Sequence, residues 1–156
     1  MAGVAEIFFD TGVLVAGNVD LGEASASPLR LLDAVAEGEI GRPLTAWHCC
    51  LEFFSVTTRL PEEYRLAPAE ALRFLREEIL PRFEVHDLPP ASREPFLASL
   101  AAEGIAGGRI YDAHIGEVAL RAGARAVVTD NRRHFTPLMR HGVPVLTSEE
   151  LLAQLT

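Results

Sequence analysis

Short apolar segments with the pattern of buried strands alternate with helical patterns along this 156-residue chain, and that alternation limits its fold more than any other feature. Parallel strands need long crossover connections, and a helix is the usual crossover. We therefore expect an α/β protein with a three-layer α/β/α fold, in which a mainly parallel sheet is covered by helices on both faces. The predicted strands span residues 6–9, 43–47, 82–88, 125–130 and 143–147, and the predicted helices span residues 27–40, 48–60, 68–79, 92–104, 109–123 and 148–155.

Two of these helices carry expectations about single residues. In the helix over residues 27–40, we expect Ser27 as the N-cap and Pro28 as the first helical residue, a position where the missing N–H of proline costs nothing. In the helix over residues 68–79, Leu72, Leu75 and Ile79 have the spacing of one apolar face.

Length and composition suggest a single domain spanning residues 1–156, since no repeat or linker interrupts the pattern. No apolar run approaches the ~20 residues of a membrane-spanning helix, and the chain does not open with the basic-then-apolar order of a signal peptide. Cys49 and Cys50 are adjacent, so they cannot cross-link distant segments or converge well on a tetrahedral zinc ion. We expect a cytoplasmic protein without a membrane partner.

The charged residues exclude several classes of α/β protein. The net charge of −8 argues against a protein that coats nucleic acid by general attraction. All 14 basic residues are arginine, so the Gly-Lys-Ser/Thr of a phosphate-binding loop is absent, as is the lysine on which response-regulator receivers rely. No GxGxxG follows the first predicted strand, which removes the main support for a dinucleotide-binding fold.

Acidic residues stand where the strands of such a sheet end. Asp10 and Asp130 each close a predicted strand. Glu52 lies about two turns into the helix after the second strand, and Asp112 lies in the first turn of the helix before the fourth. Singly, these acids could cap helices, favour a helix dipole or pair with an arginine such as Arg59. Because ligands of open α/β sheets bind at the carboxyl ends of the strands, the four together favour a shared site.

A divalent metal ion would explain why four carboxylates gather at one edge. Carboxylates repel one another, and burying them without a cation is costly. Hard oxygen ligands on a partly open site suit Mg²⁺ or Mn²⁺, which also accept substrate phosphate as a ligand. Such ions activate water and neutralise charge on a phosphate under attack. The acidic edge therefore predicts hydrolysis of phosphodiester bonds.

Several segments, taken in order, resemble the successive motifs of PIN-domain proteins, above all the ribonuclease toxins of bacterial VapBC toxin–antitoxin pairs. The segments are FFDTGVLVAG, LEFFSVTTR, RIYDAHIGEVALRAGARAVVTDNRRHF and VPVLTSEELL, and the likeness is strongest from Arg109 to Phe135. It implies a Mg²⁺- or Mn²⁺-dependent site that cuts RNA. It also implies a homodimer and a small antitoxin whose tail covers the acidic edge. Carried onto this sequence, the catalytic and metal-binding acids are Asp10, Glu52, Asp112 and Asp130.

Residues next to the acids are expected to bind the substrate. Arg132 and Arg133 follow the fourth acid, where arginine can hold RNA phosphates in bidentate geometry. Thr11 and Thr129, each beside a strand-end acid, are also expected to bind substrate.

The sequence departs from the family pattern at two positions. Gly12 stands where many members have asparagine or serine after the first acid and threonine. At the fourth acid, many members place the carboxylate two residues after the threonine, where this chain has Asn131, whereas Asp130 follows Thr129 directly. A carboxylate binds a cation better than an amide does, which favours Asp130, while the spacing favours Asn131. Both stay open as the fourth metal-site residue.

The expected function is that of a Mg²⁺- or Mn²⁺-dependent endoribonuclease, the toxin of a toxin–antitoxin pair. A metal-dependent phosphatase acting on a small phosphoester is one alternative, although its motif would place a second acid at the position of Gly12. A non-catalytic PIN-like binding module is the other, and the retained acids argue against it.

Overall fold

The computed structural model describes residues 3–139 and 141–155, and five short parallel strands form its centre. The strands are β1 (Ile7–Phe9), β2 (Leu44–Ala46), β3 (Glu84–His86), β4 (Ala126–Val128) and β5 (Val145–Leu146). They lie side by side in the order β3-β2-β1-β4-β5, and every paired neighbour is parallel. All five lie within the predicted strands but are shorter, because the chain turns into a helix or loop soon after the sheet hydrogen bonds end.

The strand order reverses between β1 and β4. The chain moves outward from β1 to β2 and β3 on one side, then returns to place β4 and β5 on the other side of β1. Both central strands are buried, with Phe8 opposite Val127 and Phe9 opposite Val128. In open α/β sheets, such a reversal leaves a crevice outside the carboxyl ends of the two strands. Two of the four acids predicted to form a site, Asp10 and Asp130, follow these two strands.

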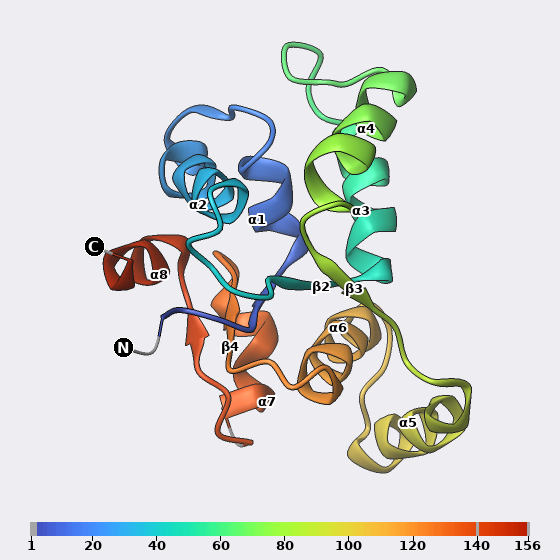
Figure 1. The fold of residues 1–156 in the computed structure, drawn as a ribbon. Helices are drawn as coiled ribbons and strands as arrows, with labels where there is room; N and C mark the ends of the chain where they lie inside the picture. Colours follow the sequence, from blue (N-terminus) through green and yellow to red (C-terminus); the bar gives the residue numbers. More distant parts are fainter. Residues whose placement is uncertain (1–2, 140, 156) are drawn as a thin grey trace.

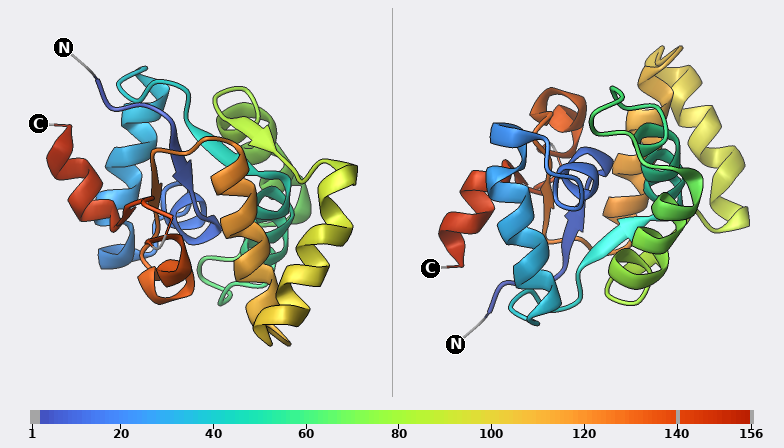
Figure 2. Two further views of the ribbon diagram at one scale, coloured as in Figure 1. Left: turned by 90° about the horizontal axis from the view of Figure 1, so that it is seen from below. Right: turned by 90° about the horizontal axis from the view of Figure 1, so that it is seen from above.

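Helices cover both faces of the sheet, which confirms the predicted three-layer α/β/α fold (Figures 1 and 2). Figure 1 shows α1 to α4 above the sheet and α5 to α7 below it. The upper helices are α1 (Thr11–Ala16), α2 (Ala26–Ala36), α3 (Trp47–Thr57) and α4 (Pro68–Phe74), which continues into the π-helical turn η2 (Leu75–Ile79). The lower ones are α5 (Pro90–Glu103), α6 (Arg109–Arg121) and α7 (Thr136–Met139). The last helix, α8 (Ser148–Gln154), packs against α2, and the 3₁₀ turns η1 (Gly22–Ser25) and η3 (Arg132–Phe135) precede α2 and α7.

The start of α2 differs from the prediction. The helix begins at Ala26 with Ser25, not Ser27, in the N-cap position. The buried hydroxyl of Ser25 donates to the carbonyl oxygen of Val19 and accepts from the N–H of Leu21, so it fixes the preceding turn and does not bond to the helix. The η1 turn leads directly into α2, which is why the helix starts before Pro28.

The apolar face predicted over residues 68–79 is also only partly correct. Leu75 and Ile79 are buried, but Leu72 is exposed. The wider π-helical turn from Leu75 to Ile79, in which the N–H of Leu80 bonds to the carbonyl of Leu75, changes the angle between successive side chains. A face laid out at constant α-helical spacing therefore does not continue through it.

Among the described helices, none combines the length and apolar character that crossing a membrane requires.

We predict that Gly17 is needed for the close approach of α1 and α2. A Cβ atom at Gly17 would lie 2.7 Å from Cγ of Leu32 and 2.9 Å from the carbonyl oxygen of Val13. Gly17→Ala is therefore expected to lower the free energy of unfolding by about 1–3 kcal/mol, the usual cost of overpacking. Gly12→Ala is the matched control, because a Cβ there meets no atom within 4 Å and the exposed helical position favours alanine. Urea denaturation measures both, and equal stability of the two variants would contradict the close contact.

Candidate active site

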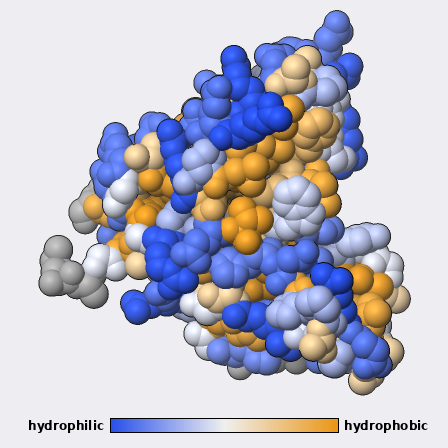
Figure 3. Space-filling view, turned by 45° about the vertical axis from the view of Figure 1, so that its right-hand side comes forward, coloured by the Kyte–Doolittle hydropathy of each residue, from blue (hydrophilic) through white to orange (hydrophobic). Residues whose placement is uncertain are grey.

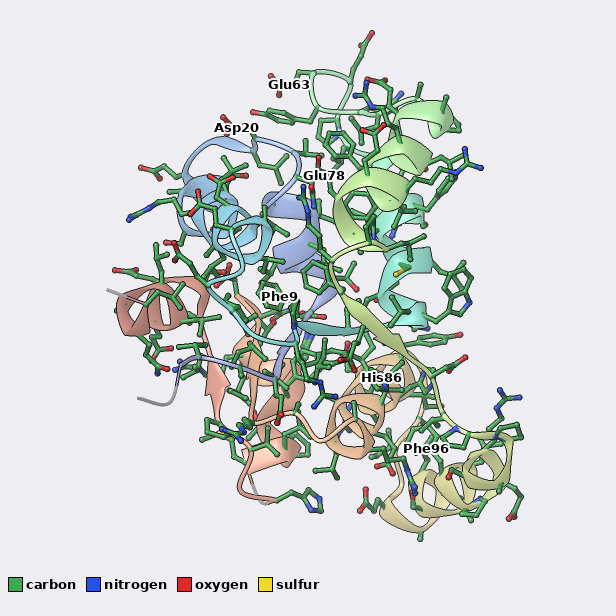
Figure 4. All side chains as sticks on the ribbon, in the orientation of Figure 1. Phe9, Asp20, Glu63, Glu78, His86 and Phe96 are labelled. Carbon is green, nitrogen blue, oxygen red and sulfur yellow. The ribbon has the colours of Figure 1, made fainter. Side chains whose placement is uncertain are left out.

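Asp10 lies at the carboxyl end of β1, beside the end of β4, and is the N-cap of α1. Its neighbour Phe9 is in the middle of the fold in Figure 4. The half-buried carboxylate accepts hydrogen bonds from the N–H of Thr11 and from the hydroxyl of Thr129, both at 2.8 Å. Elements on both sides of the strand reversal thus hold one carboxylate in place.

Glu52 is brought to the same place by α3, the helix that leaves β2. The hydroxyl of Thr11 donates to Oε1 of Glu52 at 2.8 Å, so Thr11 bonds to Asp10 through its N–H and to Glu52 through its side chain. One turn earlier on α3, Nε2 of His48 lies 3.6 Å from the same Glu52 oxygen. The alternative that Glu52 pairs with Arg59 is not what the structure has.

Asp112 lies in the first turn of α6, as predicted. Its Oδ2 atom is 3.3 Å from Nδ1 of His134, a residue of η3. That nitrogen is also 2.9 Å from the side-chain nitrogen of Asn131. Asp112 is therefore linked through a histidine to the segment that follows β4.

Burial and neighbouring carboxylates raise the pKa of Asp10 and of Asp112. Burial raises the pKa of Asp10 most, the bonds from Thr129 and Thr11 oppose it, and the charges of Glu52 and Asp112 raise it further, to about 6. Burial also raises the pKa of Asp112, with Glu52 adding to the rise while His134 and His48 reduce it. After burial, repulsion from a nearby carboxylate is the remaining cause that raises the pKa of each of these two aspartates.

The donor chemistry of these acids fits a hard divalent cation. Asp10, Glu52 and Asp112 offer carboxylate oxygens from three separate elements. In the described part of the chain, Oε2 of Glu52 and Oδ1 of Asp112 accept no hydrogen bond. The same residues do not yet form a finished cage, because within residues 3–139 and 141–155 no three His, Cys, Asp or Glu side chains converge closely enough to hold a metal ion as they stand.

The carboxylate of Asp130 is bonded to Ser148 at the start of α8. Its two oxygens accept hydrogen bonds from the N–H and the hydroxyl of Ser148, at 2.8 and 2.7 Å. Ser148 is the first residue of α8, so Asp130 holds the start of that helix to the end of β4. The carboxylates that act on Asp10 are Glu52 and Asp112. The structure thus brings three of the four predicted acids together, and a metal-binding role for Asp130 or Asn131 stays a prediction.

The two threonines that are predicted to contact substrate are bonded to acids. Thr129 is completely buried, and its hydroxyl donates to Asp10 while accepting from the N–H of Asn131. Thr11 is also buried, with its hydroxyl on Glu52. Both hydroxyls therefore position acids, and contact of either threonine with substrate stays a prediction.

The two arginines after β4 lie in different surroundings. Arg132 is ion-paired with Glu150 on α8. Arg133 lines a cavity that Asp112 and His134 also line. Of the two, Arg133 is therefore the one beside the acids, and phosphate binding by either stays a prediction.

Histidines of the site were not assigned a role from the sequence. His48 could have been found, because it precedes Glu52 by four residues on one helix. The sequence places His134 beside the acidic edge together with Arg132 and Arg133, but its contact with Asp112, 22 residues away in sequence, is created by the fold. His48 also contacts the rings of Tyr111 and His114, at centroid distances of 5.7 and 5.4 Å. Cys49 and Cys50 lie between His48 and Glu52 in the sequence and are buried free thiols. This supports the interpretation of both cysteines as core residues.

Comparison with known proteins agrees with this geometry. No protein-family profile matches the chain. Ribonuclease VapC40 of Mycobacterium tuberculosis strain H37Rv is 33% identical over 123 residues, which are 79% of this chain and 85% of the relative. Ribonuclease VapC27 of the same strain is 36% identical over 86 residues, 54% of this chain and 60% of the relative.

Solved structures share the fold at lower identity. PAE2754 from Pyrobaculum aerophilum aligns with a TM-score of 0.61 and 19% identity, covering 97% of this chain and 95% of that one. FitAcB from Neisseria gonorrhoeae aligns with a TM-score of 0.58 and 17% identity, covering 92% and 98%. Since a relative more than 30% identical matches most of both chains and the fold agrees, this chain belongs to the VapC family of PIN-domain ribonucleases.

Proposed function

We propose that this protein is an endoribonuclease that hydrolyses phosphodiester bonds of RNA with Mg²⁺ or Mn²⁺ bound at Asp10, Glu52 and Asp112. The observation that carries the proposal is the half-buried Asp10 carboxylate, whose pKa is raised by its burial and by the charges of Glu52 and Asp112. A divalent cation would remove that repulsion. The name of its relatives, ribonuclease VapC, supports RNA as the substrate.

The chain's own residues would prepare the site before substrate arrives. Thr11 fixes Asp10 and Glu52 relative to each other, and Thr129 fixes Asp10 from the neighbouring strand. His134 holds the carboxylate of Asp112. When bound, the cation supplies activation of a water molecule and neutralisation of charge on the phosphate.

We also propose that the enzyme is the toxin of a toxin–antitoxin pair and acts in the cytoplasm. Solved neighbours include FitAcB from Neisseria gonorrhoeae and VapBC-1 from nontypeable Haemophilus influenzae. The acids around Asp10 and the net charge of −8 make a small antitoxin with a basic tail a complementary partner.

A homodimer is the third part of the proposal. Trp47 and Leu51 lie one turn apart on α3 with exposed fractions of 48% and 53%, and Tyr111, exposed by 59%, stacks on His48 of the same helix. Figure 3 brings this side forward and shows hydrophobic surface over the helices of its upper half. Large apolar side chains gathered in this way are typical of a surface that another protein covers.

The first functional prediction is metal-dependent cleavage. Purified protein should cut single-stranded RNA in Mg²⁺ or Mn²⁺ and stop in EDTA. Asp10→Asn and Asp112→Asn should each reduce the rate by at least about 100-fold, because each removes a charged ligand that stabilises the transition state. Asp33→Asn, at an exposed position of α2, is the matched control and should retain full activity. Cleavage that continues in EDTA would contradict the mechanism.

A growth assay with the same variants distinguishes a toxin from a housekeeping enzyme. Induction of the wild-type protein alone should stop growth, Asp10→Asn should not, and co-expression of the antitoxin should restore growth. A wild-type protein that cuts RNA yet is harmless alone would overturn the toxin role and leave the nuclease intact.

A second prediction concerns stability without metal. Because the pKa of Asp10 is about 6 in the folded protein, against 3.8 for an aspartate in an unstructured chain, the native state binds more protons between these values. The free energy of unfolding should therefore fall as pH rises through this window, by up to about 3 kcal/mol from Asp10. Urea denaturation in EDTA at about pH 4 and about pH 7 measures the fall, which should be smaller in Asp10→Asn and unchanged in Asp33→Asn. Equal falls in all three proteins would refute the repulsion.

A third prediction tests the dimer. Leu51→Glu places a charge on the exposed apolar surface of α3 and should yield a monomer at concentrations where the wild type is a dimer, as measured by light scattering. Met139→Glu is the control, since Met139 is equally exposed but lies on α7, below the sheet. A monomeric wild type, or a dimer that Leu51→Glu leaves intact, would exclude this surface.

A further inference from the structure

A cavity of about 540 Å³ lies between α5, α6 and the η3–α7 segment. Its walls are apolar where the helices meet, with Phe96 and Leu100 from α5, Leu120 from α6, and Phe135 and Leu138 from the segment after β4. Figure 4 labels Phe96 on the side of α5 that faces α6. The volume is within the ~300–1,000 Å³ of pockets that hold small organic groups.

The cavity shares a wall with the acidic site. Asp112 and His134, which contact each other at 3.3 Å, both line it. Ala113, the residue after Asp112, lines it from the same turn of α6. A group inside the cavity would therefore adjoin a phosphate held at the acids.

Two guanidinium groups line the same cavity. Arg109 from the start of α6 and Arg133 from η3 belong to its lining, and neither is ion-paired with an acid in the described part of the chain. Glu117, also in the lining, is paired with Arg121. Arginine offers paired donors to phosphate oxygens, so these two side chains suit an anion that extends past the cavity.

We propose that this cavity receives one nucleobase of the substrate RNA, beside the scissile phosphate, while Arg109 and Arg133 bind the phosphates that flank it. The inference rests on the proposed ribonuclease function. A nucleotide combines a flat, largely apolar ring with an adjacent anion, which matches apolar walls next to free guanidinium groups. A base held there is withdrawn from pairing and stacking, so the site would select unpaired nucleotides.

Filling the cavity tests the proposal through binding, without any need for cleavage. The protein is the full chain carrying Asp10→Asn in Mg²⁺, and the probes are labelled dodecauridylate and a dodecamer of the same backbone without bases. We expect the probe with bases to bind about tenfold more tightly, as the burial and stacking of a base allow. Ala113→Leu fills the cavity from α6 and should reduce this ratio to about one by weakening only the probe with bases.

Three further variants make the test specific. Ser99→Leu fills the cavity from the facing helix α5 and should repeat the result if Ala113→Leu proves unstable. Ala98→Leu is the control, because Ala98 is exposed on α5 outside the cavity lining, and it should keep the tenfold ratio. Arg133→Ala should weaken both probes by the same factor, since it removes a phosphate contact.

The proposal is overturned if Ala113→Leu and Ser99→Leu keep the same ratio as Ala98→Leu, or if the unfilled protein does not distinguish the two probes. Either result would show that the cavity does not hold a base of the bound RNA. Loss of cleavage activity has no part in this readout, so a failed ribonuclease proposal and a failed base-binding proposal are told apart.

Discussion

The hydrogen bonds that two buried threonines donate to acids determine the arrangement of the whole site. Thr11 joins Asp10 to Glu52, and Thr129 joins Asp10 to the end of β4. These bonds are possible only because β1 and β4 are adjacent parallel strands whose carboxyl ends meet. The sheet order places β1 beside β4, α1 begins next to Asp10, and α3 brings Glu52 to the same place. Together these elements hold carboxylates that repel one another.

This arrangement costs stability in the absence of a cation. Burial and like charge both oppose ionisation of Asp10, and the threonine bonds offset only part of that opposition. Acids whose pKa is shifted by burial and by a neighbouring like charge cluster at functional sites. Asp130 shows the contrast, because its carboxylate receives two good hydrogen bonds from Ser148 and stabilises the start of α8.

The sequence was sufficient for the fold and for three acids of the site. The strands followed from local apolar patterns, and the grouping of Asp10, Glu52 and Asp112 followed from the rule that parallel strands end at one edge together with the resemblance to PIN-domain proteins. The partner of Asp130 could not be read, since Ser148 is 18 residues away and the spacing of a carboxylate does not reveal which donor it meets. The bonds of Thr11 and Thr129 to acids could not be read either, because the fold decides which carboxylate each buried hydroxyl meets. The π-helical turn after Phe74 depends on tertiary packing and has no residue signature in this segment.

The first turn of α6 links the separate parts of the proposed function. Successive residues of a helix point about 100° apart, so three neighbours face three directions. Tyr111 stacks on His48 beside the exposed residues of α3, Asp112 faces Glu52 and His134, and Ala113 lines the cavity under α5. A rotation or shift of this single turn would change all three environments together. A base bound in the proposed cavity would lie against Ala113, and a second subunit on the proposed α3 surface would lie near Tyr111, so each would contact a residue adjacent in sequence to Asp112.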